Sequence, residues 1–62
     1  MNPVFEVGQS VAAYQGYFYD RGTVKQVLQF DERQQEWRYL IRFRAGYEAD
    51  VAELFVRPIE PA

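Results

Sequence analysis

Apolar side chains recur at every second position in several segments of this 62-residue chain, which is the spacing of half-buried β-strands. Residues 37–44 are the clearest case. Their alternating positions share one face of a strand and are Trp37, Tyr39, Ile41 and Phe43. Residues 10–14 predict a shorter strand with Val11 and Ala13 on one side. The pattern therefore indicates an all-β protein.

Residues 22–30 predict a further strand, in which the apolar positions change phase between Val24 and Val27. A β-bulge near Gln26 accounts for this change, because one extra residue restores the buried face. Polar residues 31–36 predict the tip of a hairpin that leads into the next strand.

The C-terminal part of the chain predicts shorter elements. A tight connection around Gly46, where glycine can adopt positive φ, leads to a short strand over residues 50–52. One 3-10 or helical turn near residues 52–55 then precedes a final short strand that Pro58 limits. An α-helix over residues 49–56 is the alternative, although a helix of that length is marginal on its own.

Five short strands in so small a chain predict a sheet that closes on itself. Closure removes exposed strand edges, and a bulge supplies the bending that closure needs. We therefore expect a single five-stranded SH3-like barrel over residues 1–62, with short tails at residues 1–3 and 59–62.

The amino-acid composition excludes several kinds of functional site. The chain has no Cys and no His, which excludes disulfides, zinc sites of the usual kind and a histidine general base. It also lacks a Gly-rich phosphate loop, so we expect no metal, no cofactor and no catalytic activity. Aromatic residues make up 18% of the chain and supply core area that a short chain otherwise lacks.

No segment approaches the roughly 20 apolar residues that span a bilayer, and the N-terminus has no signal-peptide pattern. We therefore expect a soluble intracellular protein, cytoplasmic or nuclear, without a membrane partner. The net charge of −2 argues against a non-specific polyanion binder and is compatible with a cationic partner.

The aromatic segment between the first two predicted strands is the strongest functional signal. Residues 14–22 read Tyr-Gln-Gly-Tyr-Phe-Tyr-Asp-Arg-Gly. Loops run over the surface because their backbone groups need solvent, so some of these rings should be accessible. Tyr17 and Phe18 lie at the expected tip and predict a contact with a partner or with a second subunit.

Residue spacing over most of the chain resembles that of chromo-barrel and Tudor-like domains. The matching elements are Phe5-x-x-Gly8-x-x-Val11, Gly16-x-x-Tyr19, Gly22-x-Val24 and Tyr39-Leu40-Ile41-x-Phe43-x-x-Gly46-Tyr47. The chain departs from the chromo-barrel pattern at two positions, Tyr47 and Phe55, where chromo-barrel domains commonly carry Trp.

The resemblance implies an aromatic cage for a methylated lysine or arginine. A methylated ammonium keeps its charge but loses hydration, so each ring face attracts it by about 0.5 to 2 kcal/mol. The rings at cage or cage-flanking positions are Tyr14, Tyr19, Phe43 and Tyr47. The nearby negative charge would come from Asp20, Glu48 or Asp50.

Each of these rings also has a packing interpretation. Tyr14 and Tyr19 can wedge against the end of the barrel, Trp37 and Phe43 can belong to the core, and Tyr47 can cap the barrel. We therefore predict a non-catalytic recognition module for a peptide or protein ligand. One alternative is a homo-oligomer that assembles through Tyr17 and Phe18.

Basic residues suggest a further alternative, weak nucleic-acid binding. The residues of this stripe are Lys25, Arg38, Arg42 and Arg44, and the three arginines share the strand face opposite Tyr39. Such a stripe can hold phosphates. It can equally be neutralised by cross-strand pairs with Glu36, Glu48, Asp50 or Glu53.

Overall fold

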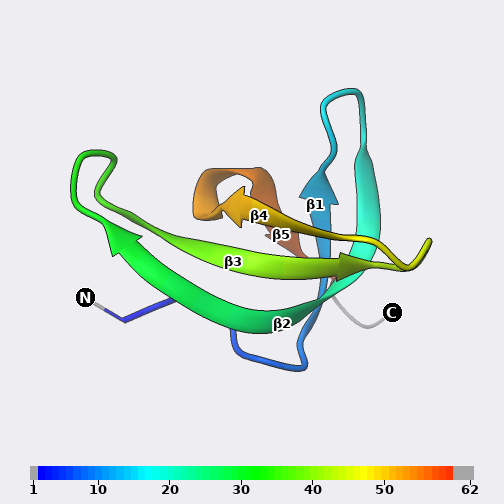
Figure 1. Ribbon diagram of the computed structural model, residues 1–62, viewed down its shortest axis with the longest axis horizontal. Helices are drawn as coiled ribbons and strands as arrows, with labels where there is room; N and C mark the ends of the chain where they lie inside the picture. Colours follow the sequence, from blue (N-terminus) through cyan, green and yellow to red (C-terminus); the bar gives the residue numbers. More distant parts are fainter. Residues whose placement is uncertain (1, 60–62) are drawn as a thin grey trace.

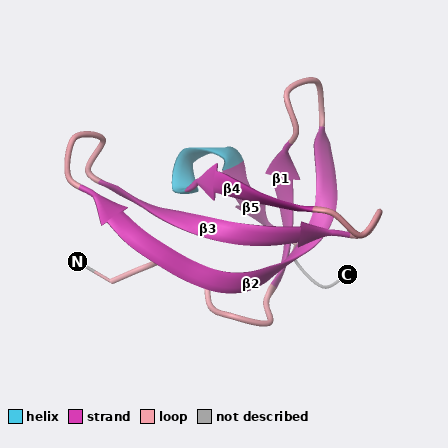
Figure 2. Ribbon diagram, in the orientation of Figure 1, coloured by secondary structure: helices cyan, strands magenta, loops and turns pink. Residues whose placement is uncertain are grey.

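The computed structural model describes residues 2–59, which form five antiparallel strands in one sheet and a single 3-10 turn (Figures 1 and 2). The elements are β1 (Ser10–Tyr14), β2 (Tyr19–Asp31), β3 (Glu36–Phe43), β4 (Glu48–Ala52), η1 (Glu53–Phe55) and β5 (Val56–Pro58). The strand order in the sheet is β4-β3-β2-β1-β5. The all-β prediction and the short 3-10 turn are therefore confirmed.

The C-terminal elements differ from the helical alternative. Residues 49–56 contain the end of β4, η1 and the first residue of β5, so the α-helical alternative is wrong. Residues 2–3 and 59 of the expected tails lie outside the strands, and residues 1 and 60–62 lie outside the part described. No helix within residues 2–59 is long and apolar enough to cross a membrane.

Strand β2 begins three residues earlier than its sequence pattern predicts. Tyr19 pairs with Tyr14, and Asp20 pairs with Ala13, so the β1–β2 hairpin extends to the connection at residues 15–18. A backbone hydrogen bond of 3.0 Å from the Gln15 amide to the Phe18 carbonyl closes this connection. Much of the aromatic segment is therefore strand rather than loop.

Two irregularities bend β2 against β3. One register shift falls between Val24 and Gln26, where the sequence predicts a bulge, and a second falls between Val27 and Phe30. Bulges increase local twist and bend the strand that carries them. Figure 1 shows the result, a β2–β3 pair that curves across the molecule with β1 standing across one end.

The core lies on the inner side of this bend and takes residues from all five strands. Its buried members are Phe5, Val11, Ala13, Val24, Tyr39, Ile41, Phe43, Val51 and Val56. The predicted inward face of β3 is buried from Tyr39 onwards, while Trp37 is only partly buried and packs edge-on against Phe30. The sheet is open, because β4 and β5 are its two edges and do not pair within residues 2–59.

The Tyr39 hydroxyl connects three parts of the chain. It accepts hydrogen bonds from the amides of Val4 (3.0 Å) and Phe5 (3.3 Å) and donates one to the Glu53 carboxylate (2.5 Å). The Phe5 ring meets the Tyr39 ring edge-on, with centroids 5.4 Å apart. The N-terminal segment and η1 are thereby attached to β3.

Candidate functional site

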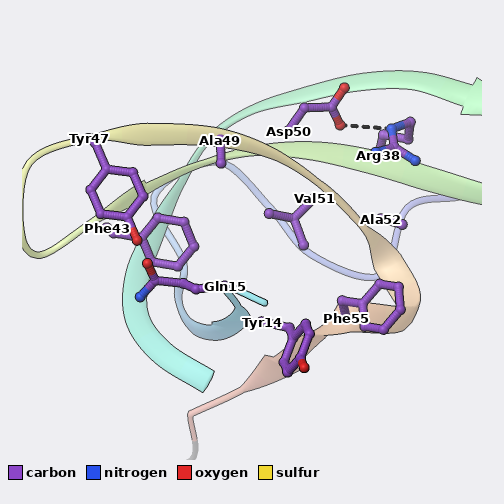
Figure 3. Close-up of a pocket in the computed structure, with 10 residues that line it drawn as sticks. All are labelled: Tyr14, Gln15, Arg38, Phe43, Tyr47, Ala49, Asp50, Val51, Ala52 and Phe55. Atoms are coloured by element: carbon purple, nitrogen blue, oxygen red, sulfur yellow. Dashed lines mark hydrogen bonds and ion pairs between the residues drawn. The ribbon is translucent and has the colours of Figure 1, made fainter. Parts of the chain in front are cut away.

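An open pocket with a volume of about 370 Å³ lies between the end of β1, strand β4 and η1 (Figure 3). Its aromatic residues are Tyr14, Phe43, Tyr47 and Phe55. Its small apolar residues are Ala49, Val51 and Ala52, and its polar residues are Gln15, Arg38 and Asp50. We call this site the aromatic pocket.

One side of the aromatic pocket is a stack of Tyr47 on Phe43, with ring centroids 5.0 Å apart and ring planes 25° apart. The tight turn between β3 and β4 produces this stack. Gly46 adopts φ 105°, as the sequence predicts, and its amide donates to the Phe43 carbonyl at 2.8 Å. Phe43 is only 2% exposed whereas Tyr47 is 46% exposed, so Tyr47 presents the accessible ring.

The other side of the aromatic pocket is formed by Tyr14 and Phe55. Their rings stack with centroids 5.7 Å apart and planes 27° apart, although Tyr14 comes from β1 and Phe55 from η1. Tyr14 also donates a hydrogen bond from its hydroxyl to the Gly16 carbonyl at 2.9 Å. Figure 3 shows Val51 between this side and the Tyr47–Phe43 side.

The predicted residue Tyr19 lies outside the pocket lining. Its ring is tilted against Tyr14, with centroids 5.4 Å apart, and the Arg57 guanidinium lies 4.0 Å from its centroid. A cation from the chain itself therefore already occupies one face of this ring.

Two of the three predicted acidic residues, Asp20 and Glu48, also lie outside the lining. The Asp20 carboxylate accepts hydrogen bonds from Gln15 Nε2 (3.0 Å) and from the Arg21 amide (2.8 Å), and it pairs with Arg44 Nε (3.2 Å). Glu48 is exposed at the start of β4. The structure thus brings Tyr14, Phe43 and Tyr47 together and uses Asp20 to hold the β1–β2 connection.

Asp50 supplies the carboxylate of the pocket. It pairs with Arg38 at 2.7 Å across the β3–β4 ladder, with both side chains partly exposed. Exposed pairs of this kind contribute only about 0.2 to 1 kcal/mol. An incoming cation therefore competes with Arg38 for Asp50 at little cost.

Phe55 lines the aromatic pocket, although the sequence pattern does not predict it as a site residue. The only sequence signal was its position after Leu54, where chromo-barrel domains commonly carry Trp. Its stacking on Tyr14 depends on the turn η1, which carries Phe55 back towards the end of β1.

The predicted contact residues Tyr17 and Phe18 lie outside the aromatic pocket. Tyr17 and Phe18 are 93% and 57% exposed at the tip of the β1–β2 connection. Two arginines of the predicted basic stripe form ion pairs, Arg38 with Asp50 and Arg44 with Asp20. The stripe is therefore partly neutralised.

No protein-family profile matches the chain, and neither a characterised protein nor a solved structure is similar to it at a significant level. Within the part of the chain that the structure describes, no cluster of three or more acidic side chains is placed to hold a metal ion. The shape and chemistry of the aromatic pocket therefore decide which function to propose.

Proposed function

We propose that this protein is a non-catalytic recognition module that binds a peptide or protein ligand through a cationic, methylated lysine or arginine side chain. The observation that carries the proposal is the arrangement of two aromatic stacks around one open space with small apolar residues between them.

The pocket offers what a methylated cation needs. Three of its rings, Tyr14, Tyr47 and Phe55, are between 38% and 46% exposed, so their surfaces are available without unfolding the core. Each favourable ring contact with a cation is worth about 0.5 to 2 kcal/mol. Ala49 and Val51 receive the methyl groups, and Asp50 lies near enough to balance the charge.

We further propose that the bent sheet is an SH3-like barrel of the Tudor-like or chromo-barrel kind. In support, two bulges bend β2, all five strands share one core, and a 3-10 turn precedes the last strand. In this arrangement the aromatic pocket lies where β4 and η1 approach the end of β1.

Titration of the ¹⁵N-labelled protein with lysine peptides tests the function. Trimethyllysine peptides should shift the amide signals of Tyr14, Tyr47, Val51 and Phe55, and the unmodified peptide should bind more weakly. Tyr47→Ala should weaken binding about tenfold or more, because it removes the most exposed pocket ring.

Tyr17→Ala is the matched control, because it removes an equally large ring that does not line the pocket. It should leave the affinity for the methylated peptide unchanged. The proposal is wrong if millimolar methylated lysine and methylated arginine peptides both leave the pocket signals in place, or if the two alanine variants lose affinity equally.

Self-association is a second candidate function, favoured by the exposure of Tyr17 and Phe18 on neighbouring positions of one connection. Large apolar side chains that stand free on a surface are typical of contacts with another chain. If a second copy covers them, the protein forms a symmetric dimer or a larger ring.

Light scattering after size exclusion tests this second candidate. The protein should run as an oligomer at high concentration, and the double variant Tyr17→Ala, Phe18→Ala should shift it to a monomer. The pair Val4→Ala, Val7→Ala is the control, since both valines are also exposed but lie on the N-terminal segment. A strict monomer at millimolar concentration would eliminate this candidate.

A further inference from the structure

A second concavity, of about 660 Å³, is lined by arginine side chains at one end of β2 and β3. Its polar lining residues are Ser10, Arg21, Thr23, Arg42 and Arg44, and we call it the arginine concavity. Arg21 and Thr23 flank Gly22 on β2, and Arg42 precedes the buried Phe43 on β3, so these three side chains point away from the core. Arg44 follows the end of β3.

Strand register brings these polar side chains together. Thr23 of β2 lies directly opposite Arg42 of β3 and also opposite Ser10 of β1, which makes one row across three strands. The Cβ atoms of directly opposite residues in an antiparallel pair lie about 4.5 to 5.5 Å apart. The Arg44 amide donates to the Arg21 carbonyl at 3.1 Å, which places Arg44, just after β3, beside Arg21 of β2.

Two guanidinium groups in this concavity have no partner in the part of the chain that the structure describes. Within residues 2–59, neither the Arg21 nor the Arg42 side chain makes a hydrogen bond, ion pair or ring contact. Arg38, Arg44 and Arg57 contrast with them, since each is held by a carboxylate or a ring.

Local charge in the concavity opposes the charge of the whole chain. Three of the seven basic residues gather here, although the net charge is −2. The carboxylates nearby are Asp20, which pairs with Arg44, and Glu48, which lies opposite Arg42 in the β3–β4 ladder. The concavity therefore keeps a positive excess together with the hydroxyls of Ser10 and Thr23.

We infer that the arginine concavity binds the phosphate group of a small phosphorylated ligand, at a site separate from the aromatic pocket. Guanidinium groups match phosphate oxygens with paired, charge-assisted hydrogen bonds, and hydroxyls supply further donors. Arg21 and Arg42 bind the phosphate, and Thr23 is opposite Arg42 in the row and two residues after Arg21 on β2.

The lining favours a small phosphorylated molecule over a nucleic-acid strand. Single-stranded nucleic acid binds where exposed rings stack on its bases. The aromatic residue that lines this concavity, Phe43, is only 2% exposed and cannot present a ring face. A net acidic chain also repels an extended polyanion outside the concavity.

Amide-detected NMR titration with inorganic pyrophosphate at low salt tests the inference, with sodium chloride matched for ionic strength as the reference. Pyrophosphate should cause saturable shifts at Ser10, Thr23 and Arg42. Arg21→Gln and Arg42→Gln should each weaken binding at least about fivefold, whereas Arg33→Gln, which removes the same charge at the β2–β3 hairpin tip, should change it less than about twofold.

A parallel titration with a nucleoside diphosphate identifies the source of the phosphate. Tighter binding than pyrophosphate assigns the site to nucleotides, and equal binding assigns it to free phosphate groups. The inference fails if pyrophosphate produces no saturable shift, if Arg33→Gln loses as much affinity as Arg42→Gln, or if only an oligonucleotide binds.

Discussion

Replacing Gly22 with alanine is expected to lower the free energy of unfolding by about 2 kcal/mol, because overpacking of a buried contact typically costs 1 to 3 kcal/mol. A Cβ at this position would lie 2.7 Å from Ile41 Cγ2 and 2.8 Å from the Arg42 carbonyl oxygen. Ile41 is fully buried and the carbonyl belongs to β3, so neither atom can move without shifting the core or the sheet.

The expected loss of stability in Gly22→Ala is opposite in sign to the usual effect of this substitution in a strand. Elsewhere in a strand, alanine is usually about 0.5 to 1 kcal/mol more favourable than glycine. A domain of this size has a total stability of only several kcal/mol, at roughly 0.05 to 0.15 kcal/mol per residue. Thermal and urea unfolding should therefore show a large loss for Gly22→Ala.

Gly46→Ala separates the two reasons for which a glycine is needed. Gly46 has φ 105° and nothing within 4 Å of an added Cβ, so its substitution tests backbone strain without a clash. We expect a loss of about 1 kcal/mol there, smaller than at Gly22. A Gly22→Ala protein as stable as the parent would show that β2 and β3 are not packed this closely.

Removing the Tyr39 hydroxyl is expected to destabilise the protein by about 1 to 3 kcal/mol, because buried polar groups lose their partner. In Tyr39→Phe the amides of Val4 and Phe5 lose an acceptor, and the Glu53 carboxylate loses a donor. The phenyl ring still fills its place beside Phe5, so the loss reports the hydrogen bonds rather than a cavity.

The same residue makes stability dependent on alkaline pH. Burial, followed by the hydrogen bond to Glu53, raises the pKa of Tyr39 above its ordinary value of 10.0. The folded protein therefore holds this proton more tightly than the unfolded chain does. The resulting stabilisation is complete below pH 10 and is lost as the pH rises through the raised pKa.

Urea unfolding between pH 8 and about 11.5 measures this dependence against the ordinary tyrosine value. Stability of the parent should fall above pH 10, and Tyr39→Phe should show a shallower fall, since it has no proton to lose at this position. Tyr17→Phe is the control, because it removes only the hydroxyl of a side chain that is 93% exposed, and its unfolding curves should match those of the parent. If stability falls equally steeply with pH in Tyr39→Phe and in the parent, the alkaline loss of stability does not come from Tyr39.

Alternation along β1 and β3 was enough to predict these strands closely. In β1 the buried Val11 and Ala13 are separated by one residue that faces outward, and in β3 the same holds for Tyr39 and Ile41. The phase change at Gln26 likewise located a bulge. Local patterns of this kind depend only on the period of a strand and on which face is buried.

The start of β2 did not follow from such a pattern. Residues 19–21, Tyr-Asp-Arg, do not alternate between apolar and polar, and they become strand because they pair with residues 12–14 of β1. The second register shift, between Val27 and Phe30, also depends on the partner strand. Pairing between strands depends on how their side chains pack together, so neither strand's sequence predicts it alone.

In each of the two concave sites, some residues were predicted from the sequence and others are brought together only by the fold. Three rings of the aromatic pocket, Tyr14, Phe43 and Tyr47, and the carboxylate of Asp50 are among the positions that the family resemblance implies, whereas Phe55 joins them only in the folded sheet. The arginine concavity replaces the predicted stripe because register sets Arg42 beside Thr23 and leaves Arg38 paired with Asp50.

The sequence by itself determined that this protein is all-β and that alternate residues of β3 face the core. It also showed that aromatic side chains are the main candidates for ligand contacts. Only the tertiary structure decided which rings meet, which arginines stay free and where the sheet bends. Strand period is a local property, whereas these three features depend on contacts between residues far apart in the chain.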